Sequence, residues 1–214
     1  MITLDFAGYN SRLDKAVLKN SGEIKILSNG ARVIYFNKKG KDRMVMMSGV
    51  HSDERGGPIA ILKFLENNQI TIEEELVIVP LLNDHGWDVN KREHSGIDIN
   101  RNFNKNGPEF IVELMEILEE KPIDVFVDLH EDCDENGFVY KLKNDPSKLA
   151  DNVAKIANCP IEYEEDHEIW GDTTEKFVRS LGCIHTVTTE APGKISAKEK
   201  VEWNYKIVKY LLTN

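Results

Sequence analysis

The chain has 214 residues, of which 41% are hydrophobic and 30% charged, and its formal net charge is −10. This composition argues against the disordered, fibrous and membrane-spanning classes and predicts a single globular domain over residues 1–214. Because the negative charge repels phosphate backbones and anionic lipid headgroups, we expect neither nucleic acid nor a membrane as a partner.

The first predicted element is a β-hairpin at residues 23–36, where apolar and polar residues alternate around Asn29-Gly30. Two apolar runs, residues 43–50 and 76–82, have the length and boundaries of buried strands. Between them, Pro58 suits the first turn of a helix with apolar residues at 3.6-residue spacing. The order strand, helix, strand is typical of a parallel sheet, and the hairpin is expected to extend one edge of it.

The second half of the chain continues this alternation. Pro108 opens a helical pattern that Pro122 ends, and an apolar strand follows at residues 123–129. The remaining predicted elements are helices at 148–157 and 173–180, a strand at 183–188, and a helix at 196–212 that opens with a Ser196/Glu199 capping box. The pattern predicts an α/β fold, a three-layer sandwich with a mainly parallel mixed central sheet flanked by helices.

The six histidines include two that directly follow predicted strands. His51 begins an H-x-x-E sequence ending at Glu54, just after the strand at 43–50, and His130 comes directly after the strand at 123–129. In open α/β sheets, ligands bind at the carboxyl ends of the strands, so these three side chains are expected to converge. Two histidines and a glutamate form a catalytic zinc set with one open position. Taken singly, each histidine fits an ordinary surface or strand-end residue better than a metal ligand.

Two further polar segments belong to the same predicted edge. The loop 92–103 contains Arg92 and Arg101, which would repel a nearby cation unless an anion, such as a substrate carboxylate or a developing oxyanion, lay between them. Glu190 closes the last strand before Pro192-Gly193, where its carboxylate could take a proton from an activated water. Considered separately, these segments also fit an exposed loop and a solvated glutamate.

Four motifs occur in register along the chain: Gly49-Val50-His51-Ser52-Asp53-Glu54, Gly96-Ile97-Asp98-Ile99-Asn100-Arg101-Asn102-Phe103, Asp128-Leu129-His130 and Thr188-Thr189-Glu190. Together they resemble the zinc carboxypeptidase family, in the clan that includes the succinylglutamate desuccinylase and aspartoacylase branch. The resemblance spans residues 49–193. It implies one zinc ion held by His51, Glu54 and His130.

The resemblance also implies roles for other residues. Asp98 would orient His51, Glu190 would be the general base, Arg92 would polarise the scissile carbonyl, and Asn100 and Arg101 would hold the substrate's terminal carboxylate. The implied activity is zinc-dependent hydrolysis of an amide or peptide bond next to a free carboxylate. The implied partner is a small peptide or an acylated amino acid.

Other functions stay open at this stage. The same residues suit an N-acyl amino acid deacylase of the succinylglutamate desuccinylase/aspartoacylase type, or an amidase of cell-wall peptides. A zinc-bearing binding module without turnover would be expected to lack Glu190 or a ligand. A purely structural domain would contain no stoichiometric zinc, which metal analysis can test.

The sequence departs from the family pattern at several positions. Asn83-Asp84-His85-Gly86 replaces the usual Asn-Pro-Asp-Gly, which leaves His85 without a role, and neither Tyr163 nor Trp170 aligns with the family's flexible tyrosine. The specificity pocket is expected within residues 163–180. The cysteines Cys133, Cys159 and Cys183 are odd in number and form no C-x-x-C pair, so reduced thiols are expected. With an N-terminus that is neither basic nor apolar, they predict a cytoplasmic protein.

Overall fold

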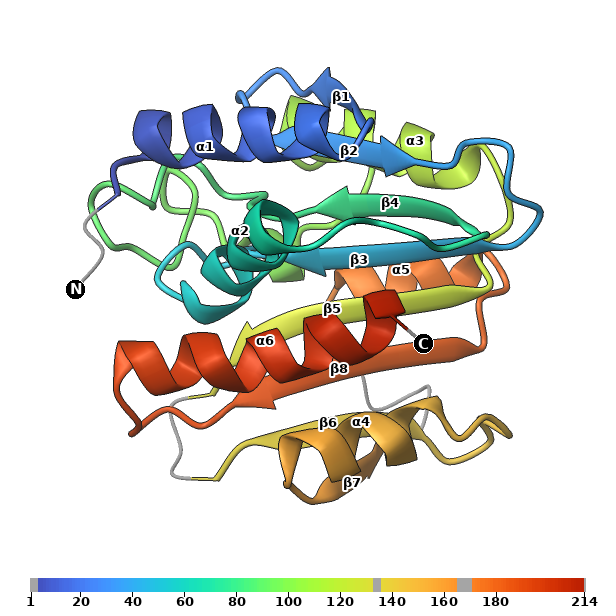
Figure 1. Cartoon of the computed structure of the whole chain (residues 1–214). Helices are drawn as coiled ribbons and strands as arrows, with labels where there is room; N and C mark the ends of the chain where they lie inside the picture. The colour runs from blue at the N-terminus through green and yellow to red at the C-terminus, as the bar shows by residue number, and fades with distance from the viewer. Residues whose placement is uncertain (1–3, 133–135, 165–170, 214) are drawn as a thin grey trace.

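The computed structural model describes residues 4–132, 136–164 and 171–213. Within these ranges the strands form one eight-stranded sheet with the order β1-β2-β4-β3-β5-β8-β6-β7 (Figure 1). The strands are β1 (Glu23–Ile26), β2 (Arg32–Phe36), β3 (Arg43–Ser48), β4 (Glu75–Val79), β5 (Val125–Glu131), β6 (Phe138–Leu142), β7 (Ile161–Glu164) and β8 (His185–Ala191).

The centre of the sheet is parallel. Strands β4, β3, β5 and β8 all run in one direction, so their carboxyl ends lie at the same edge (Figure 1). On this edge His130 of β5 pairs directly with Glu190 of β8. The hairpin β1–β2 joins antiparallel to β4, and β6 joins antiparallel to β8. The predicted hairpin and its position at one edge of the sheet are confirmed.

Helices cover both faces of the sheet, as predicted for a three-layer sandwich (Figure 1). One face carries α1 (Phe6–Lys19), α2 (Gly56–Asn67), α4 (Leu149–Ala157) and α6 (Ala197–Thr213). The other face carries α3 (Glu109–Glu119) and α5 (Thr174–Ser180). Because strand side chains alternate between faces, the strands β2 to β5 contribute to both apolar layers; Val127 of β5 packs into the first layer and Phe126 into the second.

One α-helix and two strands were not predicted from the sequence: α1, β6 and β7. The helix α1 buries Tyr9, Leu13 and Val17 along one stripe, but its glycine and its polar residues weaken the helical pattern. The strands β6 and β7 have only 5 and 4 residues, which is too short for alternation to stand out. The strand predicted at 183–188 begins and ends later, at His185 and Ala191, so Glu190 lies within it.

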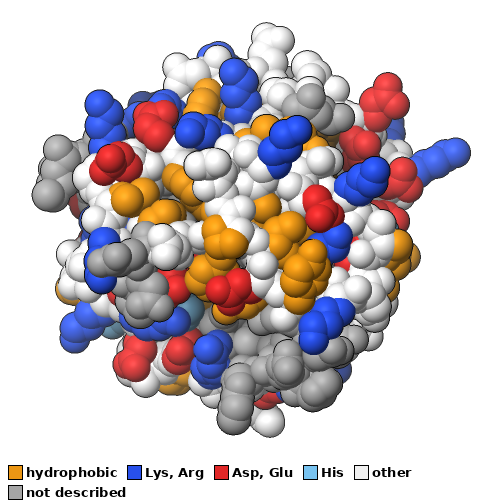
Figure 2. All heavy atoms as spheres, turned by 90° about the horizontal axis from the view of Figure 1, so that it is seen from below, with side chains coloured by type: hydrophobic (Ala, Val, Ile, Leu, Met, Phe, Trp, Pro, Cys, Tyr) orange, Lys and Arg blue, Asp and Glu red, His pale blue; other side chains and the backbone are white. Residues whose placement is uncertain are grey.

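The sheet edge at β7 leaves some apolar side chains exposed. Ile156 of α4 is 39% exposed and Tyr163 of β7 is 54% exposed. Figure 2, which views the molecule from this edge, shows apolar side chains mixed with charged ones.

Across the described ranges, every helix is too short or too polar to cross a bilayer.

The predicted capping box at the start of α6 is present. The Ser196 hydroxyl accepts a hydrogen bond from the Glu199 backbone N–H at 3.3 Å, and the Glu199 carboxylate accepts one from the Ser196 N–H at 2.8 Å. We predict that Ser196→Ala lowers the free energy of unfolding by about 1 kcal/mol, because the Glu199 N–H at the helix start loses its acceptor. Urea denaturation measures this change.

The exposed Lys198, in the same helical turn, provides the control. Lys198→Ala should alter the free energy of unfolding by less than about 0.5 kcal/mol. Equal losses in the two variants would contradict a capping role for Ser196.

Candidate functional site

A glycine turn carries the H-x-x-E segment past the end of β3. Gly49 has φ +60°, and a Cβ at this position would lie 2.7 Å from Cδ1 and 3.0 Å from Cα of Leu81. A larger residue would therefore meet both backbone strain and a clash. The turn leaves His51 and Glu54 between the end of β3 and the start of α2, at the carboxyl edge of the sheet.

The start of α2 is tied to β5 and α6 through Glu131. Its Oε1 accepts a hydrogen bond from the Gly56 N–H at 2.5 Å, and its Oε2 accepts one from Lys200 Nζ of α6 at 2.6 Å. The Glu131 N–H in turn donates to Oε2 of Glu54 at 3.2 Å. These contacts fix Glu54 relative to β5, the strand that carries His130.

His51, Glu54 and His130 form a compact buried cluster. The Nδ1 atom of His51 lies 2.7 Å from Oε1 of Glu54, and Nδ1 of His130 lies 3.0 Å from Oε2. The three side chains offer donor atoms that all lie within 4.8 Å of one another. The residues are only 1%, 6% and 3% exposed, respectively. The predicted convergence of these residues is therefore present in the fold.

The charges of the cluster are strongly coupled. Burial alone would raise the pKa of Glu54, but His130 and His51 hold it well below its usual range. Burial alone would lower the pKa of each histidine, yet Asp128 and Glu54 raise the pKa of His130, and Asp98 and Glu54 raise that of His51. The carboxylates thus create a strongly negative environment that requires positive charge at its centre.

This donor set fits a divalent metal ion. A neutral imidazole carries one N–H, and both nitrogens of each histidine lie near a carboxylate oxygen. If Nε2 of each histidine keeps the proton, the lone pair on Nδ1 faces the Glu54 carboxylate. This arrangement is repulsive unless a cation lies between the two groups. Two imidazoles and one carboxylate are the His₂Glu set of catalytic zinc sites.

Arg92 lies beside the cluster. Its Nη1 donates to Oε1 of Glu54 at 2.8 Å, and its side chain is 46% exposed. Asn83, which is fully buried, donates from Nδ2 to the Arg92 carbonyl oxygen at 2.9 Å and so fixes the backbone of the loop. The Arg92 side chain is therefore accessible to a ligand that lies beside the cluster, while its backbone is held in place.

The cluster opens into a pocket of about 390 Å³. Its lining residues are His51, Asp53, Glu54, Arg92, His130, Glu131, Asp132, Glu190 and Lys200. Glu190, predicted to lie at this edge, is partly buried, and burial together with the charge of Glu54 raises its pKa to about 7 against the opposing effect of His130. A carboxylate with a pKa near neutrality can both accept and donate a proton.

The structure does not bring every predicted site residue into this pocket. Asn100 and Arg101 belong to the short helix η1 (Ile99–Arg101) and are absent from its lining. The Asn100 Oδ1 accepts a hydrogen bond from the Thr174 N–H at 3.2 Å, and exposed Arg101 donates to the Asn100 carbonyl oxygen at 2.7 Å. Asp98, just before η1, lies 3.1 Å from Nε2 of His51, as expected for an orienting residue.

Other residues singled out in the sequence lie farther from the chemistry. His85 is exposed and packs against the ring of His94, with ring centroids 5.3 Å apart. Tyr163 is exposed on β7, and Cys159 and Cys183 are free thiols. Trp170 and Cys133 lie outside the described residues.

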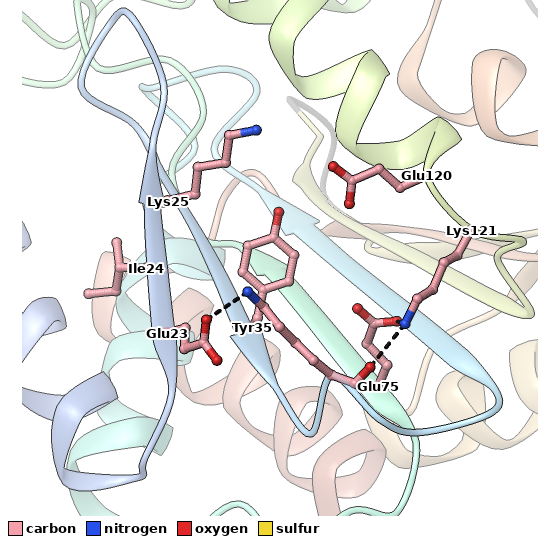
Figure 3. A pocket seen from close by; sticks show the side chains of 8 residues that line it. Glu23, Ile24, Lys25, Tyr35, Glu75, Glu120 and Lys121 are labelled. Atoms are coloured by element: carbon pink, nitrogen blue, oxygen red, sulfur yellow. Dashed lines mark hydrogen bonds and ion pairs between the residues drawn. The ribbon is translucent and has the colours of Figure 1, made fainter.

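A second pocket, of about 370 Å³, lies at the opposite edge of the sheet, between β1, β2, the start of β4 and the end of α3 (Figure 3). Its side chains include lysines and glutamates that pair with one another: Lys38 with Glu23 at 2.7 Å, and Lys121 with Glu75 at 2.7 Å. This pairing neutralises the charges locally. None of the three cluster residues lines this second pocket.

Residues 40–193 match the model of the succinylglutamate desuccinylase/aspartoacylase catalytic domain. The chain belongs to this family. The sequence resemblance to the zinc carboxypeptidase clan is thereby confirmed, and the family model falls on its desuccinylase/aspartoacylase branch. The family identifies the chain as a hydrolase of the metallopeptidase and deacylase type. No curated protein matches the sequence significantly.

Solved structures share the fold of this family member. A candidate metallopeptidase from Shewanella baltica superposes with a TM-score of 0.84 at 17% identity, covering 97% of this chain and 91% of its own. A metallo-carboxypeptidase from Burkholderia cenocepacia gives 0.75 at 12% identity, with 96% and 68% covered. The murein-tripeptide amidase MpaA from Escherichia coli O157 gives 0.68 at 17% identity, with 89% and 91% covered.

Sequence reasoning missed several residues around the cluster. Asp128 received no role, although it lies two residues before His130 on one strand and so shares its face; this spacing was a usable signal. Thr174 was noted in the specificity stretch, but its contact with Asp128 was not predicted. Lys200 gave no local signal, because its contact with Glu131 depends on how α6 docks on the sheet.

We predict that a divalent metal ion stabilises the folded protein. At a free zinc concentration about 100 times the dissociation constant, the free energy of unfolding should rise by about 2.7 kcal/mol, because the cluster exists only in the folded state. Thermal unfolding of chelator-treated protein, with and without zinc, measures this effect.

Glu54→Ala should abolish the response to zinc. His185→Ala is the matched control, because His185 lies at the far end of β8 and contacts Asp145 at 2.9 Å rather than the cluster. Stabilisation that survives in Glu54→Ala would place the metal elsewhere.

Proposed function

We propose that the protein is a zinc-dependent hydrolase that cleaves an amide or peptide bond next to a free carboxylate. The observation that carries this proposal is the buried His51, Glu54 and His130 cluster, which opens into a pocket shared with Glu190 and Arg92. This combination offers metal ligands, a proton acceptor and a hydrogen-bond donor around one space. Membership of a hydrolase family supports the same reading.

His51, Glu54 and His130 would hold the zinc ion. When bound, zinc would lower the pKa of a water molecule and polarise the scissile carbonyl. Glu54 contributes the negative charge, while the neutral imidazoles leave the ion enough Lewis acidity for this chemistry. Burial of all three residues limits competition from bulk water for the ligand positions.

Glu190 would be the general base. Its carboxylate lines the pocket one strand away from His130, with which it pairs across β5 and β8. It would accept the proton of the attacking water and later donate it to the leaving amine. The partly buried environment suits this exchange, because desolvation favours the neutral form that follows proton uptake.

Arg92 would donate hydrogen bonds to the carbonyl oxygen as negative charge develops on it. Losing one donor of this kind typically costs about 10² to 10³ in rate. Its exposed guanidinium lies on the pocket wall, and the buried side chain of Asn83 holds the backbone beneath it.

Arg101 and Asn100 would bind the substrate's free carboxylate. Arg101 is exposed and has no carboxylate partner within salt-bridge distance among the described residues. The hydrogen bond from Thr174 to Asn100 Oδ1 directs the opposite, donating end of the amide away from α5. A guanidinium and an amide N–H provide the charge and geometry that a carboxylate requires.

A second candidate is hydrolysis of N-acyl amino acids. The match over residues 40–193 is to the desuccinylase/aspartoacylase model, which favours this reading over peptide hydrolysis within the same mechanism. The fold similarity to a murein-tripeptide amidase supplies a third substrate to test. All three substrate types place an amide near a free carboxylate, so the proposed residue roles are common to them.

A substrate panel tests the proposal and separates the candidates. It contains N-acyl amino acids, short peptides with free carboxyl termini, a cell-wall tripeptide, and the amidated form of each. Zinc-dependent cleavage of only the free-carboxylate forms is expected. The substrate class that is cleaved fastest identifies the group that the enzyme prefers on the acyl side of the amide bond. Equal cleavage of the amidated forms would contradict recognition of a carboxylate.

We predict that Glu190→Gln binds zinc like the parent but loses about 10² to 10⁴ in turnover, because the amide cannot accept the proton. Zinc content by metal analysis and turnover on the best panel substrate measure the two effects. Glu199→Gln, in the exposed capping box of α6, is the matched control and should keep full turnover. Parental turnover in Glu190→Gln would remove Glu190 from the proposed role.

We predict that Arg101→Ala raises KM for free-carboxylate substrates about tenfold or more, because a charge-assisted hydrogen bond is lost. The slow cleavage of an amidated substrate, where detectable, should hardly change. Steady-state kinetics on matched pairs of substrates measure the difference. If both substrate forms suffer equally, Arg101 does not bind the carboxylate.

A further inference from the structure

Both histidines of the cluster have a carboxylate at the nitrogen that points away from Glu54. Nε2 of His51 lies 3.1 Å from Oδ1 of Asp98, and Nε2 of His130 lies 3.1 Å from Oδ2 of Asp128. Asp128 is only 1% exposed, and its Oδ1 has no hydrogen-bond partner among the described residues. The buried charge of Asp128 therefore depends on its Oδ2 contacts.

The two carboxylates are connected to each other. Asp98 Oδ1 accepts a hydrogen bond from the Asn100 backbone N–H at 2.9 Å. Asn100 Oδ1 accepts one from the Thr174 N–H at 3.2 Å, and the Thr174 hydroxyl donates to Asp128 Oδ2 at 2.6 Å. These four residues, which we name the carboxylate bridge, are linked to one another by hydrogen bonds. One end hydrogen bonds to Nε2 of His51, and the other end places Asp128 Oδ2 at ion-pair distance, 3.1 Å, from Nε2 of His130.

The carboxylate bridge lies behind the cluster. None of its four residues, Asp98, Asn100, Thr174 and Asp128, lines the pocket that His51, Glu54 and His130 share with Glu190. Its members come from the segment before and within η1, from the first turn of α5, and from β5. It joins the loop after β4 to the helix layer on one face of the sheet. For Asp98, Thr174 and Asp128, this place suits positioning of the histidines rather than contact with substrate.

We propose that Thr174, acting through Asp128, is a positioning residue that sets the orientation and tautomer of the His130 imidazole for metal binding. This inference rests on the proposed metal site. A carboxylate at Nε2 keeps the proton on that nitrogen and leaves the Nδ1 lone pair toward Glu54, where an ion would bind. The Thr174 hydroxyl donates a hydrogen bond to Asp128 Oδ2 and so fixes the carboxylate that faces His130.

The local fold explains why this threonine is held firmly. The preceding residue, Thr173, caps α5 by accepting a hydrogen bond from the Lys176 N–H at 3.1 Å. Thr174 itself is 1% exposed, so its hydroxyl is shielded from solvent. Valine has nearly the same shape, and Thr174→Val therefore removes the hydrogen bond with little change in packing.

The test measures zinc binding to the chelator-treated protein by competition with a chromophoric chelator. Asp128→Asn is expected to raise the zinc dissociation constant about 10- to 100-fold, and Thr174→Val about tenfold. Thr174→Ser, which keeps the hydroxyl, should bind zinc close to the parental affinity. Nitrogen NMR of the histidine rings should show a change of the His130 tautomer in Thr174→Val, with His51 affected less.

Thr173→Val provides the matched control. It removes the cap of α5 and should lower thermal stability, but it leaves the hydroxyl that contacts Asp128 in place, so zinc affinity should match the parent. A zinc affinity that falls equally in Thr173→Val and Thr174→Val would overturn the inference, because general loosening of α5 would then explain both.

The outcomes also separate this inference from the proposed function. Parental zinc affinity and an unchanged His130 tautomer in folded Thr174→Val would overturn the positioning role alone. Absence of zinc binding by the parent protein would overturn the proposed metal site, and the positioning role with it. Selective weakening in Thr174→Val with recovery in Thr174→Ser supports both.

Discussion

The site depends on the buried carboxylate of Glu54. Its two oxygens contact both imidazoles, the Arg92 guanidinium and the Glu131 N–H, and the residue is only 6% exposed. A buried carboxylate without compensation costs several kcal/mol, so the surroundings must supply positive charge. Imidazolium protons or a metal ion at the same place can meet this requirement. The need of the cluster for compensating positive charge therefore arises directly from the desolvation of one glutamate.

The topology of the sheet explains how such distant residues meet. Strands β3, β5 and β8 are adjacent and parallel, and their carboxyl ends deliver His51, His130 and Glu190 to one edge. Parallel neighbours require crossover connections, and here these pass through helices on both faces. The helices then take part in the site: α6 contributes Lys200, and α5 contributes Thr174. The helices that cover the sheet therefore also contribute side chains to the site.

Much of this arrangement could be predicted from the sequence. Apolar runs bounded by turn residues marked the parallel centre, and strand-end polar residues marked His51, Glu54, His130 and Glu190. What escaped prediction depends on tertiary contacts. The edge strands β6 and β7 are too short to show alternation, and the links between Asn100, Thr174 and Asp128 require the docking of α5 against the sheet. The place of Arg101 outside the pocket likewise follows from loop geometry.

The alternation of side chains along β5 makes the site sensitive to an insertion in this strand. Asp128 and His130 face one layer, whereas Val127 and Leu129 face the other. One additional residue upstream would exchange the two sets and place Asp128 and His130 in the apolar layer that Val127 and Leu129 now fill. Such a protein would lose both its site and part of its hydrophobic interior. Length variation within the family should therefore be confined to loops, with β5 invariant in length.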